Sequence, residues 1–251
     1  MSIDVIFLGL DGVLFDTEAS HLAACNTAFA SAGLSLHWDA RALRHAAATC
    51  GYACALRGAL PPNLAARDRK RAAAMEHDKH RAFHQAIVAA PLPALSAALA
   101  LIADASADGC KICIVTDLPA ATASALLSHA FGADVNSLFT VVTGGASFDG
   151  PAGTGPYARA LHAIGVHASD AIAIDAGAPA LDAAQAAGLW TVSIAPAGHG
   201  ADVVRPRQFI TYDALRELHG GPYGHQAPQP APMSAPLPAA ATAAPARKLA
   251  A

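Results

Sequence analysis

The pattern of apolar and polar positions divides the chain into short buried strands and longer helices. Residues 5–10 form an apolar run of strand length that ends at the turn signal Asp11-Gly12, which is typical of a parallel strand covered on both faces. Runs of the same kind recur at residues 111–116, 138–142, 171–175 and 189–194. Open α/β sheets place their chemistry at the carboxyl ends of such strands, so we expect the functional site near Asp11.

Segments with helical periodicity fill the intervals between these strands. Three of them precede the second strand: one from residue 18 to Gly33, one at residues 39–50, and a long helix from a cap at Asn63 to about residue 90. Later helices are expected at residues 95–106, 119–131, 156–164 and 179–187. Strands that alternate with helices of this length predict an α/β fold with a doubly wound parallel sheet.

The order of the elements predicts three parts of the chain. Residues 1–16 and 91–219 form a Rossmann-like α/β core, which is interrupted by an all-helical insertion at residues 17–90. From Gly220 the chain consists largely of Pro, Ala, Gly and Gln and cannot bury enough surface to offset its ordering entropy. We expect residues 220–251 to be a disordered tail, through which a protein partner could bind.

Composition and charge narrow the class of protein. The 251 residues are 54% hydrophobic and 14% charged, which favours a folded protein with a substantial core. The net charge of −3 gives no global attraction to nucleic acid or to a membrane surface. The early apolar run is too short and carries Asp4 and Asp11, so it predicts neither a signal peptide nor a membrane span. A cytoplasmic location is the resulting expectation.

Two clusters of potential metal ligands have simpler explanations. Cys110 and Cys113 are spaced as CxxC, but they open a predicted strand, where residues three apart point to opposite faces; we expect small core residues. His77, His80 and His84 share one helix face and could bind a transition metal. We prefer the interpretation that these histidines lie on a solvent-exposed helix face, because the neighbouring Lys79 and Arg81 would repel a metal cation.

The first strand and its turn carry a recognisable motif. The sequence FLGLDGVLFDTE resembles the first motif of the haloacid dehalogenase (HAD) superfamily, DxDGxLxD(S/T)E. Six positions match it: Asp11, Gly12, Leu14, Asp16, Thr17 and Glu18. The resemblance implies a HAD-like fold in which the helical insertion is a C1 cap. The family's nucleophilic Asp is Gly9 here, whereas Asp11 occupies the place of the general acid and base.

The second motif of the superfamily is a strand that ends in Thr or Ser, and Thr116 fits it. The resemblance implies that its hydroxyl and the following N–H groups hold phosphate, with Gly12 and Asp117 as further substrate-binding residues. Asp117 would repel a phosphate dianion, however. The alternative, which we prefer, is that Asp117 caps the helix starting at Pro119.

The third and fourth motifs have lost charged groups. The family's Lys before the helix at residues 156–164 is missing, and no Lys occurs between Lys111 and Lys248. In the fourth motif Asp175 takes the first acidic position, but the second is Ala176. Mg²⁺ is the cofactor that the resemblance implies, with Asp11 and Asp175 as its ligands. With Gly9 and Ala176 in place of carboxylates, we expect Mg²⁺ binding to be weak or absent.

The predicted cap resembles that of the CbbY-type sugar-phosphate phosphatases. The sequence FASAGLSLHWD is close to their FAEAGLxWxWD, and Lys79 and Phe83 fit their later cap helix. Two phosphate-binding elements differ. The GGKER loop is replaced by CGYAC at residues 50–54, and the LRPG return to the core has no Arg at residues 91–94.

These losses occur together, while the structural part of each motif remains. We therefore expect a catalytically degenerate phosphatase-like protein that acts, if at all, as a binding or regulatory module. The alternative is an active, atypical hydrolase of a small phosphorylated metabolite, in which Asp11 and Asp175 perform acid and base catalysis on water. The candidate catalytic residues under that alternative are Asp11, Thr116 and Asp175. A scaffolding role through the tail has only composition in its favour.

Overall fold

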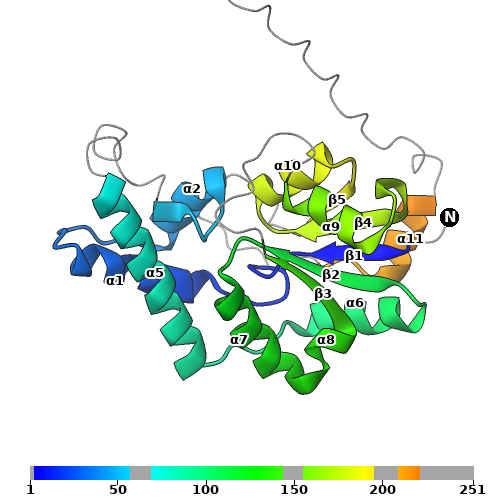
Figure 1. The fold of residues 1–251 in the computed structure, drawn as a ribbon, viewed down its shortest axis with the longest axis horizontal. Coiled ribbons are helices and arrows are strands. Elements are labelled where there is room, and N and C mark those ends of the chain that lie inside the picture. The colour runs from blue at the N-terminus through cyan, green and yellow to red at the C-terminus, as the bar shows by residue number, and fades with distance from the viewer. Residues whose placement is uncertain (1–2, 57–68, 144–154, 195–208, 221–251) are drawn as a thin grey trace, which may run out of the picture.

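A parallel five-stranded sheet forms the centre of the protein (Figure 1). The computed structural model describes residues 3–56, 69–143, 155–194 and 209–220. The strand order is β3-β2-β1-β4-β5, and every neighbouring pair is parallel. The strands are β1 Val5–Leu8, β2 Lys111–Thr116, β3 Phe139–Thr143, β4 Ala171–Asp175 and β5 Trp190–Ser193. This arrangement confirms the predicted doubly wound α/β fold and places β1 in the middle.

Helices cover both faces of the sheet, because successive strand residues point to opposite sides. Ile6 and Leu8 pack in one apolar cluster with α6, α7 and α11, whereas Val5 and Phe7 pack in a second cluster with α9 and α10. The helices of the first face are α6 Ser96–Ala107, α7 Ala120–Phe131 and α11 Tyr212–Gly220, and those of the second are α9 Pro156–Ile164 and α10 Ala178–Ala186. The same part of the chain contains a short helix, α8 Val135–Leu138, and two 3₁₀ turns, η1 Gly132–Asp134 and η2 Ala168–Asp170.

The CxxC pair confirms this division of the core. Cys110 packs in the first cluster and Cys113 in the second, so the two thiols lie on opposite faces as predicted. Both are free, and burial raises the pKa of each to about 12. The two residues are therefore inert core residues.

The helical insertion follows β1 and has an apolar cluster of its own. Its described helices are α1 Glu18–Ser31, α2 Ala40–Cys50 and α5 Arg69–Ala89. Phe29 packs edge-to-face on Trp38 at 4.9 Å, and the Asn26 amide bonds both the N–H and the C=O of Trp38. Asp39 caps α2 by accepting from the N–H of Ala42 at 2.8 Å.

The segment by which the chain leaves the core lies beside the segment by which it returns. Phe15 pairs antiparallel with Ala94, and the N–H of Leu95 donates to the C=O of Leu14 at 2.9 Å. These contacts lie close to the boundaries predicted for the insertion. The boundaries themselves remain a prediction, and the expected helix start at Asn63 lies outside the described residues.

One further difference from the sequence-based expectation concerns the end of the chain. The sequence patterns did not predict α11, which begins after Thr211, whose hydroxyl accepts from the N–H of Ala214 at 3.3 Å. Tyr212 and Leu215 of this helix are buried in the first apolar cluster. The predicted tail beyond residue 220 lies outside the described residues. No helix in the described part of the chain is both long and apolar enough to cross a bilayer.

Candidate functional site

The predicted site residues lie at the carboxyl edge of the sheet, as the fold requires. Asp11 follows β1, whereas Thr116 and Asp175 are the last residues of β2 and β4, and Asp117 follows Thr116. The three carboxylates influence one another, since the charges of Asp11 and Asp175 both contribute to the raised pKa of Asp117. The structure therefore brings the candidate residues into one acidic cluster, which the helices of the insertion adjoin.

The carboxylate of Asp175 occupies the space in which a side chain at position 9 would begin. A Cβ added to Gly9 would lie 2.9 Å from Cγ of Asp175 and closer still to its Oδ2. Real Cβ atoms do not approach other atoms so closely, so one of the two groups would have to move. Gly9 is therefore part of the packing of Asp175, in addition to being the position at which the motif resemblance places the nucleophile.

Asp175 is almost completely buried, with 6% of its surface exposed. Its Oδ1 accepts from the N–H of Gly177 at 2.8 Å. Burial raises the pKa of Asp175 to about 7, and the negative charge of Asp11 acts in the same direction. Hydrogen bonds from the backbone of Gly177 and Ala176 oppose this shift but do not cancel it. Near neutral pH the group exchanges between its charged and neutral forms.

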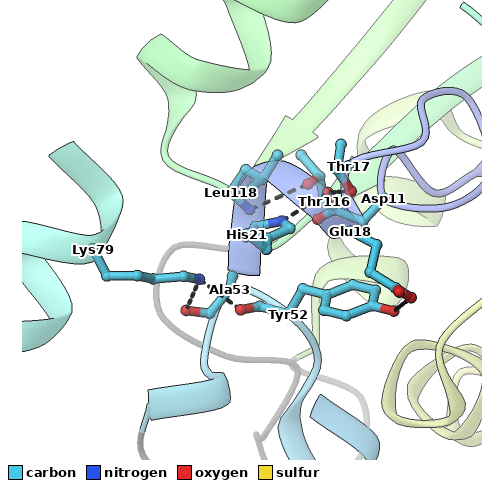
Figure 2. A network of polar contacts seen from close by, with 9 residues as sticks. All are labelled: Asp11, Thr17, Glu18, His21, Tyr52, Ala53, Lys79, Thr116 and Leu118. Atoms are coloured by element: carbon cyan, nitrogen blue, oxygen red, sulfur yellow. Dashed lines mark hydrogen bonds and ion pairs between the residues drawn. The ribbon is translucent and has the colours of Figure 1, made fainter. Parts of the chain in front are cut away.

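Asp11 is held in one orientation by the first residues of the insertion (Figure 2). Its Oδ1 accepts hydrogen bonds from Oγ1 of Thr17 at 2.6 Å and from Nε2 of His21 at 3.1 Å. Burial would raise the pKa of Asp11, but His21, Thr17 and the charge of Lys79 together outweigh it and hold the pKa below its usual value. Asp11 is thus an ionised, oriented carboxylate at neutral pH.

His21 is a site residue that the sequence patterns did not single out. The ring is fully buried and stacks between Phe83, at 4.0 Å, and Tyr52, at 5.3 Å. Burial lowers the pKa of His21 to about 4, and the nearby charge of Lys79 contributes. The neutral ring donates from Nε2 to Asp11, so its buried Nδ1 is an acceptor, and it has no partner. Thr17 and His21 are four residues apart, the spacing that places two side chains on one helix face.

Lys79 is buried, in contrast to the surface position assumed for the basic residues beside the histidines. Only 1% of its surface is exposed, and its Nζ donates to the backbone C=O of Tyr52 at 2.5 Å and of Ala53 at 2.9 Å (Figure 2). The loop that lacks the family's basic residues is therefore tied to α5 by Lys79. The same loop is tied to Glu18, which accepts from the Tyr52 hydroxyl at 2.9 Å and also from Arg44 at 2.6 Å.

Asp117 does not cap a helix, so the preferred interpretation of this residue was wrong. Helix α7 has Pro119 at its N-cap position, without any side-chain capping bond. Asp117 is only 9% exposed, and its Oδ2 has no hydrogen-bond partner. This oxygen faces the insertion, because a Cβ on Gly51 would lie 3.2 Å from it. Burial raises the pKa of Asp117 well above its usual range, and the charge of Asp11 adds to the effect.

The two remaining candidates use their polar groups within the protein. The hydroxyl of Thr116 accepts from the N–H of Leu118 at 3.1 Å. Gly12 has a positive φ of 74°, which favours glycine, and its N–H donates to the C=O of Phe15 at 2.8 Å. Gly12 therefore shapes the turn after β1, and its role in binding a substrate remains a prediction.

The described residues do not fit a metal site. No three His, Cys, Asp or Glu side chains within the described ranges are arranged so that they could hold a metal ion. On the helix face predicted to carry histidines, His84 contacts the Thr122 hydroxyl at 3.2 Å, and His80 lies 3.9 Å from Glu76. At the sheet edge Gly9 and Ala176 contribute no side-chain oxygen ligands. The loop at residues 150–154, where the family's Lys is missing, lies outside the described residues.

Comparisons with known proteins identify relatives of the whole arrangement. The family model of haloacid dehalogenase-like hydrolases matches residues 3–188. The plasmid-encoded protein CbbY of Cupriavidus necator is 32% identical over 194 residues, which are 74% of this chain and 76% of that protein. CbbY of Rhodobacter capsulatus is 27% identical over 202 residues, 76% of this chain and 85% of that protein.

Solved structures with the same fold include CbbY from Rhodobacter sphaeroides. A crystal structure of a mutant in complex with xylulose-1,5-bisphosphate matches with a TM-score of 0.64 and 23% identity, covering 77% of this chain and 87% of that one. A second, in complex with phosphate, matches with a TM-score of 0.64 and 22% identity, covering 82% and 90%. At this level of identity the structural likeness establishes the fold alone.

The contact between Gly9 and Asp175 predicts a coupled pair of mutations. Gly9→Ala should destabilise the protein by about 1–3 kcal/mol, because the added methyl group overlaps the Asp175 carboxylate. In the Asp175→Ala background most of this penalty should disappear, which a double-mutant cycle by urea unfolding measures. Gly155→Ala is the control, since a Cβ there meets nothing within 4 Å. An equal penalty for Gly9→Ala in both backgrounds would contradict the proposed overlap.

His21 predicts a specific loss of stability in acid. The unfolded chain takes up a proton on this residue near its ordinary pKa of 6.5, whereas the folded chain does so only near 4. Its contribution is therefore complete above pH 6.5 and lost as the pH falls toward 4, by about 2–3 kcal/mol. His21→Gln, which keeps a donor for Asp11, should lose less stability than the unaltered protein between pH 7.5 and 4.5. As a control, His162→Gln changes an exposed histidine and should leave the dependence of stability on pH unchanged. Identical stability profiles for His21→Gln and the unaltered protein would exclude this role of His21.

Proposed function

The chain belongs to the haloacid dehalogenase-like hydrolase family, and we propose that it is a CbbY-like member that no longer catalyses phosphoryl transfer. Its site serves instead as a binding or regulatory module. The observation that carries this proposal is the Asp175 carboxylate in the space beside Gly9. A site that only lacked its nucleophile would leave that space open, whereas here a buried residue has been packed into it.

The metal requirement supports the same proposal. Members of the superfamily usually use Mg²⁺, which neutralises charge on the transferred phosphoryl group. In this chain Asp11 already accepts two hydrogen bonds, and Asp175 is bonded to Gly177. The position after Asp175 is Ala176, so the expected second acidic ligand is absent. Few carboxylate oxygens are therefore left for Mg²⁺ among the described residues, which supports the proposal.

One alternative function has a specific observation in its favour. The pKa of Asp11 is held low while that of Asp175 is raised to about 7, and acid–base pairs in enzymes have such separated values. Asp11 could then accept a proton from water, and Asp175 could donate one to a leaving group. This alternative is an atypical hydrolase of a small phosphorylated metabolite. It requires a nucleophile from solvent, because no side chain at position 9 can form a covalent intermediate.

We further propose that the protein is cytoplasmic and that its ligand is a small molecule. Under the alternative function this ligand is a phosphorylated metabolite. A protein partner that binds the tail is a separate part of the proposal, supported by composition alone.

A hydrolysis assay distinguishes the two functions. The unaltered protein and the Asp11→Asn variant are assayed with Mg²⁺ and a panel of sugar phosphates. We expect the two proteins to release phosphate at the same background rate, since loss of a nucleophile alone lowers turnover on the order of a millionfold. Turnover by the unaltered protein that Asp11→Asn abolishes would overturn the proposal and establish the alternative.

Restoring the lost carboxylates provides a matched test of the same site. Gly9→Asp together with Ala176→Asp should regain measurable Mg²⁺-dependent hydrolysis only if Asp175 rotates away from position 9. Adding Asp175→Asn separates the electrostatic from the steric part of this requirement. Asparagine keeps the shape of Asp175 but removes the negative charge that opposes the new Asp. Circular dichroism and melting temperature verify that each variant is folded.

A further inference from the structure

The charges at the carboxyl edge of the sheet are the reverse of those that a phosphate ester requires. Asp11, Asp117 and Asp175 follow or end neighbouring strands there; the charges of Asp11 and Asp175 both raise the pKa of Asp117, and that of Asp11 raises the pKa of Asp175. The loop of the insertion that faces Asp117 contributes Gly51 and Tyr52 and carries no basic side chain. A phosphate dianion placed among these groups would be repelled by the ionised Asp11 and, in its charged form, by Asp175, and it would find no basic side chain on this loop.

Two buried polar atoms at the site have no hydrogen-bond partner. Asp117 is 9% exposed, and its buried Oδ2 has no hydrogen-bond partner. Nδ1 of the neutral His21 is a second buried acceptor without a partner. Native proteins rarely leave buried polar atoms unpaired, and each such atom calls for an explanation. A ligand that brings N–H groups and positive charge would pair with both atoms, because a nearby cation favours the ionised form of Asp117, whose oxygens then accept hydrogen bonds.

Lys79 does not fill this role. Its Nζ donates to the backbone of Tyr52 and Ala53, and no ion pair joins it to Asp117 among the described residues. Its charge nevertheless favours the ionised forms of Asp11 and Asp117. Lys79 is therefore committed to the backbone of this loop and leaves Oδ2 of Asp117 without a hydrogen bond.

We propose that the seam between the sheet edge and the Gly51–Tyr52 loop binds an organic cation through a primary ammonium group, with Asp117 as its principal partner. This inference rests on the proposed non-catalytic function and names the ligand class of that site. An ammonium group donates hydrogen bonds in three directions and, unlike a metal ion, needs no fixed set of coordinating oxygens. It therefore suits a place where carboxylates converge but the described side chains form no metal site.

The test compares a cation with a neutral molecule of the same shape. The full chain is titrated with putrescine, with its diol counterpart butanediol, and with inorganic phosphate, by thermal shift and calorimetry. We expect putrescine to raise the melting temperature and to bind measurably, while butanediol and phosphate do neither. A response to phosphate without one to putrescine, or an equal response to butanediol, would overturn the inference.

Two variants locate the binding. Asp117→Asn keeps the side chain's shape and should weaken putrescine binding about tenfold or more, because an amide cannot become the carboxylate that pairs with the ammonium group. Asp104→Asn, on the exposed face of α6, changes the net charge equally and should leave the affinity unchanged. Equal affinities for both variants would show that any binding is nonspecific. Melting temperatures of the unliganded variants confirm that Asp117→Asn is folded.

The outcomes separate this inference from the proposed function. Phosphate ester hydrolysis by the unaltered protein would overturn the proposed function whether or not putrescine binds. Absence of hydrolysis together with no response to putrescine would overturn the cation site alone.

Discussion

The buried carboxylate of Asp175 against Gly9 constrains the rest of the site. Burying a carboxylate is unfavourable unless hydrogen bonds or a raised pKa offset the loss of hydration. Asp175 has both, since the N–H of Gly177 bonds it and its pKa rises to about 7. It also needs the volume that a side chain at position 9 would take. While Asp175 keeps this position, residue 9 must remain glycine, so the glycine at position 9 and the placement of Asp175 depend on each other.

The insertion supplies the groups that organise the remaining carboxylates. Thr17 and His21 fix Asp11, and the ring of His21 is itself fixed between two aromatic side chains. Lys79 connects the long helix of the insertion to the loop that faces Asp117. These contacts join the insertion to the sheet edge through buried polar groups, which are sensitive to the removal of any one partner. Asp11 therefore has a fixed orientation although position 9 carries no carboxylate.

The fold could be predicted from local patterns, because each strand is a short apolar run and each helix has clear ends. Residues 156–164 and 171–175 were assigned with their observed bounds, since Gly165 ends the helix and the strand is uniformly apolar. Helix α11 was missed, because only Thr211 and the spacing of Tyr212 and Leu215 mark it. The candidate site was harder, since its contacts join residues far apart in the sequence. The burial of Lys79 and the unpaired oxygen of Asp117 depend on how the insertion packs, which no local pattern encodes.

We propose that this site does not form a covalent bond to phosphorus. The most direct measurement is intact-protein mass spectrometry after incubation with Mg²⁺ and acetyl phosphate, a small phosphoryl donor. We predict an unchanged mass, because no carboxylate occupies the nucleophile position and Asp11 and Asp175 are held by their own hydrogen bonds. The addition of one phosphoryl group that hydroxylamine removes, mapped to Asp11 or Asp175, would contradict the claim.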